Sequence, residues 1–128
     1  MKVAYVDTSY LIAIAFAEPG AVQLGRLLAE YDTLVSASLA EAELQAALAR
    51  EGAEEAEAFL TDLTLVLPDE PLSTYISRVL EVGHLRAPDL WHVACALYLA
   101  DDPAQLPFFT LDARQNEIAA ALGFPCPR

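Results

Sequence analysis

Residues 2–11, KVAYVDTSYL, join a short apolar run to a carboxylate and two hydroxyls. The run over 2–6 has the length of a buried strand, and a segment of helical periodicity begins at residue 9. Asp7 therefore lies where a core strand gives way to a helix. A carboxylate is costly to bury there unless a partner compensates its charge. The stretch predicts a strand-to-helix junction that carries a polar site.

The same alternation of strand and helix continues along the chain. The predicted strands span 2–6, 33–37, 64–67 and 107–111, with a weaker candidate at 124–126. The predicted helices, about seven, span 9–17, 20–31, 38–50, 53–62, 72–82, 88–100 and 113–122. The first four strands are apolar on both faces, which is typical of parallel strands covered by helices on each side. We therefore expect one α/β domain over residues 1–128, a three-layer α/β/α sandwich with a short parallel sheet.

The composition limits the classes of function. Because 55% of the 128 residues are hydrophobic and 20% are charged, the chain can bury a real core and is not a disordered protein. The formal net charge of −12 disfavours nonspecific attraction to nucleic acid, which requires positive charge to replace phosphate counterions. Any chemistry on nucleic acid must therefore be local or depend on a cation.

Segments that would direct the chain to a membrane are not expected. No apolar run approaches the length that crosses a bilayer, and MKVAYVDTS lacks the features of a signal peptide. Cys95 and Cys126 form no CxxC pair and no disulfide framework. We expect a reduced, cytoplasmic protein.

Four carboxylates are predicted at one edge of the sheet. Asp7 follows the first strand and Asp112 follows the fourth, while Glu43 lies in the second turn of helix 38–50 and Asp89 in the first turn of helix 88–100. Ligands of open α/β sheets bind beyond the carboxyl ends of the strands, so all four side chains can reach one site.

Each carboxylate also has a structural explanation. Acidic residues in a first helical turn complement the helix dipole, which suffices for Asp89 alone, and Asp7 or Asp112 could cap the helix that it precedes. Ser38 and Glu41 match an S-x-x-E capping box, so Glu41 is predicted to be a cap partner. Glu43 lies on another helix face, among apolar positions, and a cap does not explain it. The repetition of the arrangement at one edge is the stronger indication of a site.

Four segments carry these acids: VAYVDTSYLIA, SASLAEAELQAAL, RAPDLWHVACAL and FFTLDARQNEIAAALGF. In order and spacing, over residues 3–124, they resemble the signature segments of PIN-domain ribonucleases. Among these they are most similar to the VapC-type toxins of bacterial toxin–antitoxin pairs. The resemblance implies that the chain hydrolyses RNA phosphodiester bonds as a metal-dependent endoribonuclease.

The resemblance also assigns the site. It implies that Asp7, Glu43, Asp89 and Asp112 are catalytic and hold one or two Mg²⁺ or Mn²⁺ ions. Crowded carboxylates raise one another's pKa, and a hard divalent cation with oxygen ligands relieves that repulsion. The candidate supporting residues are Thr8, Ser9, Thr110, His92, Arg86 and Arg114. We expect His92 to orient Asp89, three residues before it, or to form a structural hydrogen bond. The two arginines are expected to grip phosphate or to remain solvated. Some relatives carry a further acid after the late aspartate, where this chain has Asn116, so a fifth carboxylate is not expected.

Partners follow from the same resemblance. VapC-type toxins are neutralised by a small antitoxin whose tail covers the active site, and homodimers are usual in the family. We expect an RNA substrate, a cognate antitoxin and a homodimer.

Two other classes of protein are alternatives to a nuclease. A phosphoacceptor domain would require a second aspartate after the third strand and a later lysine, but LVLPDEP matches poorly and Lys2 is the only lysine. A catalytically inactive PIN-fold interaction module remains the alternative, although loss of activity should erode the acidic set, which is complete here.

Overall fold

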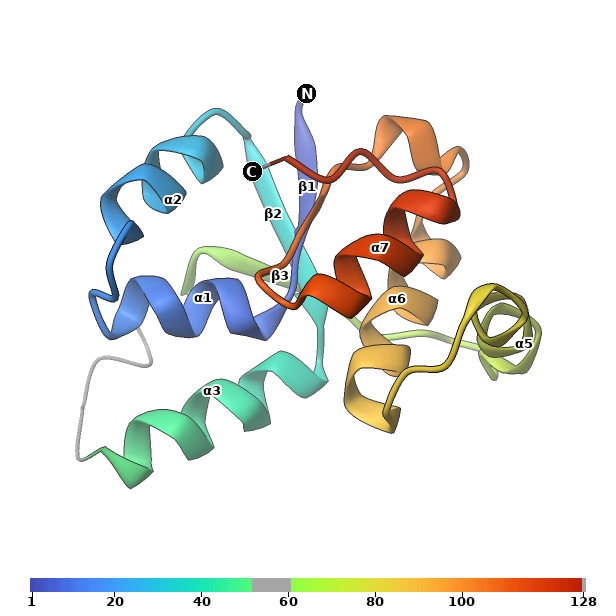
Figure 1. The fold of residues 1–128 in the computed structure, drawn as a ribbon, viewed down its shortest axis with the longest axis horizontal. Helices are drawn as coiled ribbons and strands as arrows, with labels where there is room; N and C mark the ends of the chain where they lie inside the picture. Colours follow the sequence, from blue (N-terminus) through green and yellow to red (C-terminus); the bar gives the residue numbers. More distant parts are fainter. Residues whose placement is uncertain (52–60, 128) are drawn as a thin grey trace.

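The computed structural model describes residues 1–51 and 61–127 (Figure 1). The helix expected over 53–62 falls almost entirely outside these residues. Within the described ranges, no helix combines the length and the apolar character needed to cross a membrane.

Four parallel strands form the sheet in the order β3-β2-β1-β4 (Figure 1). They are β1 (Val3–Val6), β2 (Thr33–Ala37), β3 (Leu63–Val66) and β4 (Phe108–Phe109). The expected parallel α/β fold is therefore confirmed, with β4 much shorter than the range 107–111.

The weak strand expected over 124–126 is wrong, because these residues form no strand. The segment lies against β4 all the same: the Phe108 N–H donates to the Pro125 carbonyl at 2.7 Å, and the rings of Phe108 and Phe124 have centroids 5.8 Å apart. Pro125 has no N–H of its own to donate to a ladder, which explains why the segment does not extend the sheet.

Six α-helices lie in the described part of the chain, close to the expected number. They are α1 (Thr8–Ala15), α2 (Ala21–Leu28), α3 (Leu39–Arg50), α5 (Ser73–Val82), α6 (Ala87–Leu99) and α7 (Ala113–Ala121). Pro88 lies in the first turn of α6, where its missing N–H costs nothing, and Gly123 follows α7 with a φ of 106°.

The sheet is covered on both faces, as expected for a sandwich (Figure 1). Successive strand residues point to opposite faces, so Ala4 and Val6 pack with α1 and α2, while Tyr5 packs with α5, α6 and α7. Helix α3 packs against α1 and β2. The two apolar layers hold β1 in the middle of the core.

The expected capping box at the start of α3 is wrong. The Ser38 side chain makes no capping hydrogen bond, and its backbone is already helical, with φ −57° and ψ −27°. An N-cap residue with helical backbone angles cannot turn its hydroxyl back to the first free N–H groups. Glu41 is exposed on the surface of α3.

The topology fixes where a ligand would bind. The chain runs from β1 outward to β2 and β3, then crosses to β4 on the other side of β1. The order of the strands therefore reverses between β1 and β4, and ligands of open α/β sheets bind at such a switch point. The Asp7 N–H donates to the Phe109 carbonyl at 2.8 Å, which ties the ends of these two strands together.

Candidate active site

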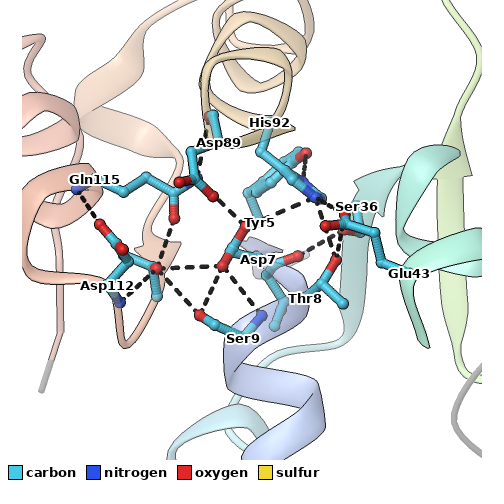
Figure 2. Close-up of polar contacts among 12 residues, drawn as sticks. Tyr5, Asp7, Thr8, Ser9, Ser36, Glu43, Asp89, His92, Asp112 and Gln115 are labelled. Carbon is cyan, nitrogen blue, oxygen red and sulfur yellow. Dashed lines mark hydrogen bonds and ion pairs between the residues drawn. The ribbon is translucent and has the colours of Figure 1, made fainter. Parts of the chain in front are cut away.

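Asp7 lies at the centre of a polar network at the carboxyl ends of β1 and β4 (Figure 2). It is the N-cap of α1 and only 3% exposed. Its Oδ2 atom accepts hydrogen bonds from the Ser9 N–H at 3.1 Å and the Ser9 hydroxyl at 2.6 Å, and the Thr110 hydroxyl lies 3.3 Å away, with its proton shared with Gln115. These donors compensate the burial of this oxygen, which explains how a core strand can end in a carboxylate.

The other carboxylate oxygen of Asp7 accepts fewer hydrogen bonds. Its Oδ1 atom accepts one long hydrogen bond, from Nε2 of Gln115 at 3.3 Å, and lies 3.6 Å from Nε2 of His92. The remaining capacity of the carboxylate to bind a cation therefore lies at Oδ1.

Glu43 and His92 form a second part of the network, on one side of Asp7 (Figure 2). Nε2 of His92 lies 2.8 Å from Oε1 of Glu43, and the Thr8 hydroxyl donates to the same oxygen at 3.0 Å. An ionised carboxylate only accepts, so Nε2 of His92 carries a proton. Burial alone would raise the pKa of Glu43, but the His92 and Thr8 hydrogen bonds and the His92 charge lower it below its usual value. The lowered pKa keeps the Glu43 carboxylate ionised, and the two hydrogen bonds fix its position.

Tyr5 forms a hydrogen bond with His92 from the core side of the site. The Tyr5 hydroxyl lies 2.8 Å from Nδ1 of His92, and the aromatic ring of Tyr5 stacks on Phe108 with centroids 5.0 Å apart. Burial raises the pKa of Tyr5 well above its usual value, so the hydroxyl keeps its proton. The structural hydrogen bonds of His92 are therefore with Tyr5 and Glu43, and the interpretation that His92 orients Asp89 is wrong.

Asp89 and Asp112 lie on the other side of Asp7 (Figure 2). Asp112 is the N-cap of α7, and its Oδ1 accepts the Gln115 N–H at 2.7 Å. The carboxylate of Asp89 forms no hydrogen bond or ion pair with any part of residues 1–51 and 61–127. Burial and the charges of Asp7 and Asp112 raise the pKa of Asp89, against smaller opposing effects of Arg86 and His92. This side of the site carries negative charge that the protein does not compensate.

Gln115 is the site residue that sequence reasoning missed. It is fully buried, accepts the Thr110 hydroxyl at 2.6 Å, and donates through Nε2 to Asp7 and to the backbone carbonyl of Asp89 at 3.1 Å. It thus joins the ends of β1, β4 and α6. The available signal was its position one turn before Ile118 and Ala119, on the apolar face of the last helix.

The two candidate arginines do not face the centre of the network. Arg114 forms an exposed ion pair with Glu117, with Nη1 and Oε2 3.3 Å apart. Its Nη2 lies so close to Gly83 that a Cβ built there would approach it to 2.6 Å, so this side chain lies at the end of α5. Arg86 is exposed directly before α6 and acts on Asp89 only through its charge.

Comparison with known proteins identifies the family. A family model described as the PIN domain matches residues 4–121. The chain belongs to the PIN domain family. PIN domains are typically nucleases, and the family generally uses divalent metal ions. A search of curated proteins found no match to the chain.

The donors of this PIN domain fit a hard cation in type. Asp7, Asp89 and Asp112 offer carboxylate oxygens, which Mg²⁺ and Mn²⁺ prefer. Burial and the charges of Asp7 and Asp112 raise the pKa of Asp89, and a bound cation would offset that repulsion. As the side chains stand, no three His, Cys, Asp or Glu residues among those described lie close enough together to hold a metal ion. Because Mg²⁺ is usually held by one or two carboxylates, with water and substrate phosphate in its other positions, the carboxylates present still fit such an ion.

Proposed function

We propose that this PIN domain is a Mg²⁺- or Mn²⁺-dependent endoribonuclease that hydrolyses RNA phosphodiester bonds. The observation that carries the proposal is the carboxylate of Asp89. It lies in the first turn of α6 beside two other acids, without a hydrogen-bond partner among the described residues and with a raised pKa. A bound divalent cation would stabilise the ionised form of such a carboxylate more than that of an acid that already has partners.

Three of the acids would bind the ion through their carboxylate oxygens. Asp7 would bind it through Oδ1, since Oδ2 is occupied by Ser9 and Thr110. Asp89 would turn its carboxylate toward the same ion. Asp112, the N-cap of α7 after β4, would offer a further carboxylate oxygen. When bound, a divalent cation supplies an activated water and neutralises charge on the phosphate in the transition state. Magnesium in particular takes few carboxylates and shares its remaining positions between water and substrate phosphate.

Glu43 would act on the attacking water rather than as a principal metal ligand. His92 and Thr8 both bind Oε1, so the second carboxylate oxygen is the one free to accept a hydrogen bond from water. Its lowered pKa keeps it ionised near neutral pH, so it is always able to accept. The Tyr5–His92 pair would fix its position, which matters because misplacement of a catalytic group by about 1 Å can cost on the order of 100-fold in rate.

A cation would also bring the substrate to an acidic protein. The net charge of −12 repels phosphates at long range. A cation bound at the uncompensated acids would reverse that repulsion locally, so cleavage would be directed to this site.

We further propose that the chain is the toxin of a VapC-type toxin–antitoxin pair, acts in the cytoplasm and forms homodimers. The similarity of the four segments in order and spacing supports this assignment. A strongly acidic toxin is complementary in charge to a basic antitoxin tail.

The test of the nuclease proposal uses the purified protein and an unstructured RNA labelled at one end. Cleavage should require millimolar Mn²⁺ or Mg²⁺ and should stop when EDTA is added in excess. RNA that stays intact with and without added metal would favour the inactive interaction module, and cutting that persists in excess EDTA would contradict the metal dependence.

A further inference from the structure

A hollow of about 250 Å³ lies beside the acidic site, between α1, α2 and the start of α7. Its walls include Tyr10, Leu24, Thr110, Leu111, Asp112 and Asn116. Thr110 and Asp112 also belong to the acidic site, so the hollow and the site share a wall.

The hollow contains a polar group without a partner. Asn116 is 9% exposed, and the hydrogen bonds in which it takes part use its backbone alone, the N–H to the Asp112 carbonyl and the carbonyl to Cys126. In the described part of the chain, no side-chain nitrogen or oxygen is both wholly enclosed and unpartnered. The Asn116 amide must therefore be open to the hollow, where it offers one acceptor and two donors.

Besides Asn116, Thr110 and Asp112, the walls are formed by apolar and aromatic side chains. The Tyr10 ring is 1% exposed and fixed by packing against Phe109, with centroids 5.3 Å apart. Leu111 is 48% exposed, although it stands between two site residues and its N–H is bound by the Ser9 hydroxyl at 3.2 Å. An exposed leucine held rigidly at a polar edge has no role in the core of this fold.

We propose that the hollow binds one unpaired nucleobase of the RNA, next to the phosphate that is cleaved, and that the Asn116 amide hydrogen-bonds the edge of that base. This inference rests on the proposed nuclease function and adds sequence preference to it. A base has apolar faces and an edge with adjacent donor and acceptor, which matches apolar walls and one amide. It is also uncharged, so Asp112 does not repel it, as it would repel a phosphate.

The binding test uses the fact that Asn116 is the only asparagine in the chain. Protein labelled with ¹⁵N-asparagine gives one side-chain amide nitrogen, seen as a pair of NH₂ signals, which reports on the hollow without any catalysis. Adenosine, guanosine, cytidine and uridine are titrated separately to 10 mM. At least one should shift these signals saturably, and Leu111→Ala should weaken that binding several-fold, whereas Leu80→Ala, at a similarly exposed leucine of α5, should not.

The cleavage test uses a pool of single-stranded RNA with random sequence, whose product ends are sequenced. The wild type should prefer one base at one fixed position beside the cut. Asn116→Ala should reduce that preference by about tenfold, the scale of one bidentate base contact, while cleavage itself continues. Leu80→Ala should keep the wild-type preference.

The outcomes separate this inference from the proposed function. Metal-dependent cleavage with no base preference, or with a preference unchanged in Asn116→Ala, would overturn the base site and leave the nuclease intact. An amide signal unmoved by all four nucleosides would overturn it as well. Absence of cleavage in the wild type would instead contradict the nuclease proposal, and the nucleoside titration would still decide whether the hollow takes a base.

Discussion

Nε2 of His92 lies 2.8 Å from Oε1 of Glu43, a contact that joins α6 to α3 across the end of β1. His92 is 1% exposed, and its Nδ1 forms a hydrogen bond with the Tyr5 hydroxyl in the core. The position of Glu43, near the surface, is thus set by a hydrogen-bonded chain that begins inside the sheet.

Removal of this imidazole should affect both stability and rate. His92→Ala removes the 2.8 Å hydrogen bond between the buried Tyr5 hydroxyl and Nδ1 of His92, so the free energy of unfolding should fall by about 1–3 kcal/mol, measured by urea denaturation. Cleavage should be reduced but not abolished, because Glu43 is still present. Tyr5→Phe, which removes one oxygen and keeps the ring, should cause a smaller loss of the same kind. Full activity in His92→Ala would show that Glu43 needs no such support.

The raised pKa of Asp89 predicts a specific pH dependence of stability. Because its pKa is higher in the folded than in the unfolded state, ionised Asp89 destabilises the fold, and the effect disappears as pH falls below the unfolded value. Asp89→Asn should therefore melt above the wild type at pH 7.5 without metal, and the gap should narrow toward pH 4. Asp101→Asn, at an exposed acid, is the control and should show no such gap. A gap for Asp89→Asn that is constant over this range would contradict the assigned cause.

Much of this site could be predicted from the sequence, since the end of a parallel strand has a known place in the fold. Asp7, Glu43, Asp89 and Asp112 were placed at one edge from the order of strands and helices alone. The partners of His92 could not be predicted, because spacing along one helix favours Asp89 while the contact with Glu43 depends on how α3 packs. Gln115 was missed because a single polar residue in a helical pattern has many explanations until its burial is known. The capping box at Ser38 was predicted from a local motif and does not form, because the chain after β2 already has helical backbone angles at Ser38.

Gln115 should be critical for stability although it is not an acid. Gln115→Ala leaves Thr110, Asp7 and the Asp89 carbonyl each short of a partner, so the free energy of unfolding should fall by about 1–3 kcal/mol or more. Gln115→Glu keeps the shape but adds a charge beside Asp7, so its loss of stability should be relieved by Mn²⁺. Gln45→Glu, on the exposed face of α3, is the matched control and should melt like the wild type. Equal melting temperatures for the two glutamate variants would contradict the role assigned to Gln115.

Metal binding should be visible as stability. A ligand that binds only the folded state raises its melting temperature, by an amount that grows with ligand concentration relative to its Kd. Millimolar Mn²⁺ should therefore raise the melting temperature of the wild type, and the rise should be much smaller in Asp7→Asn and Asp89→Asn. In Asp7→Asn the amide must also place a donor against donors, since every partner of Asp7 donates. A wild-type melting curve indifferent to Mn²⁺ would count against the cation site.

The central claim is that this acidic site cleaves RNA, and the most direct measurement compares Asp7→Asn with Glu41→Gln in the same metal-dependent assay. Both changes remove one negative charge with little change in shape, but Asp7 lies at the centre of the network while Glu41 is exposed on α3. Asp7→Asn should lower the rate by roughly two orders of magnitude or more, the scale of losing one preorganised electrostatic group. Glu41→Gln should cleave at the wild-type rate. An Asp7→Asn protein as active as Glu41→Gln would contradict the account.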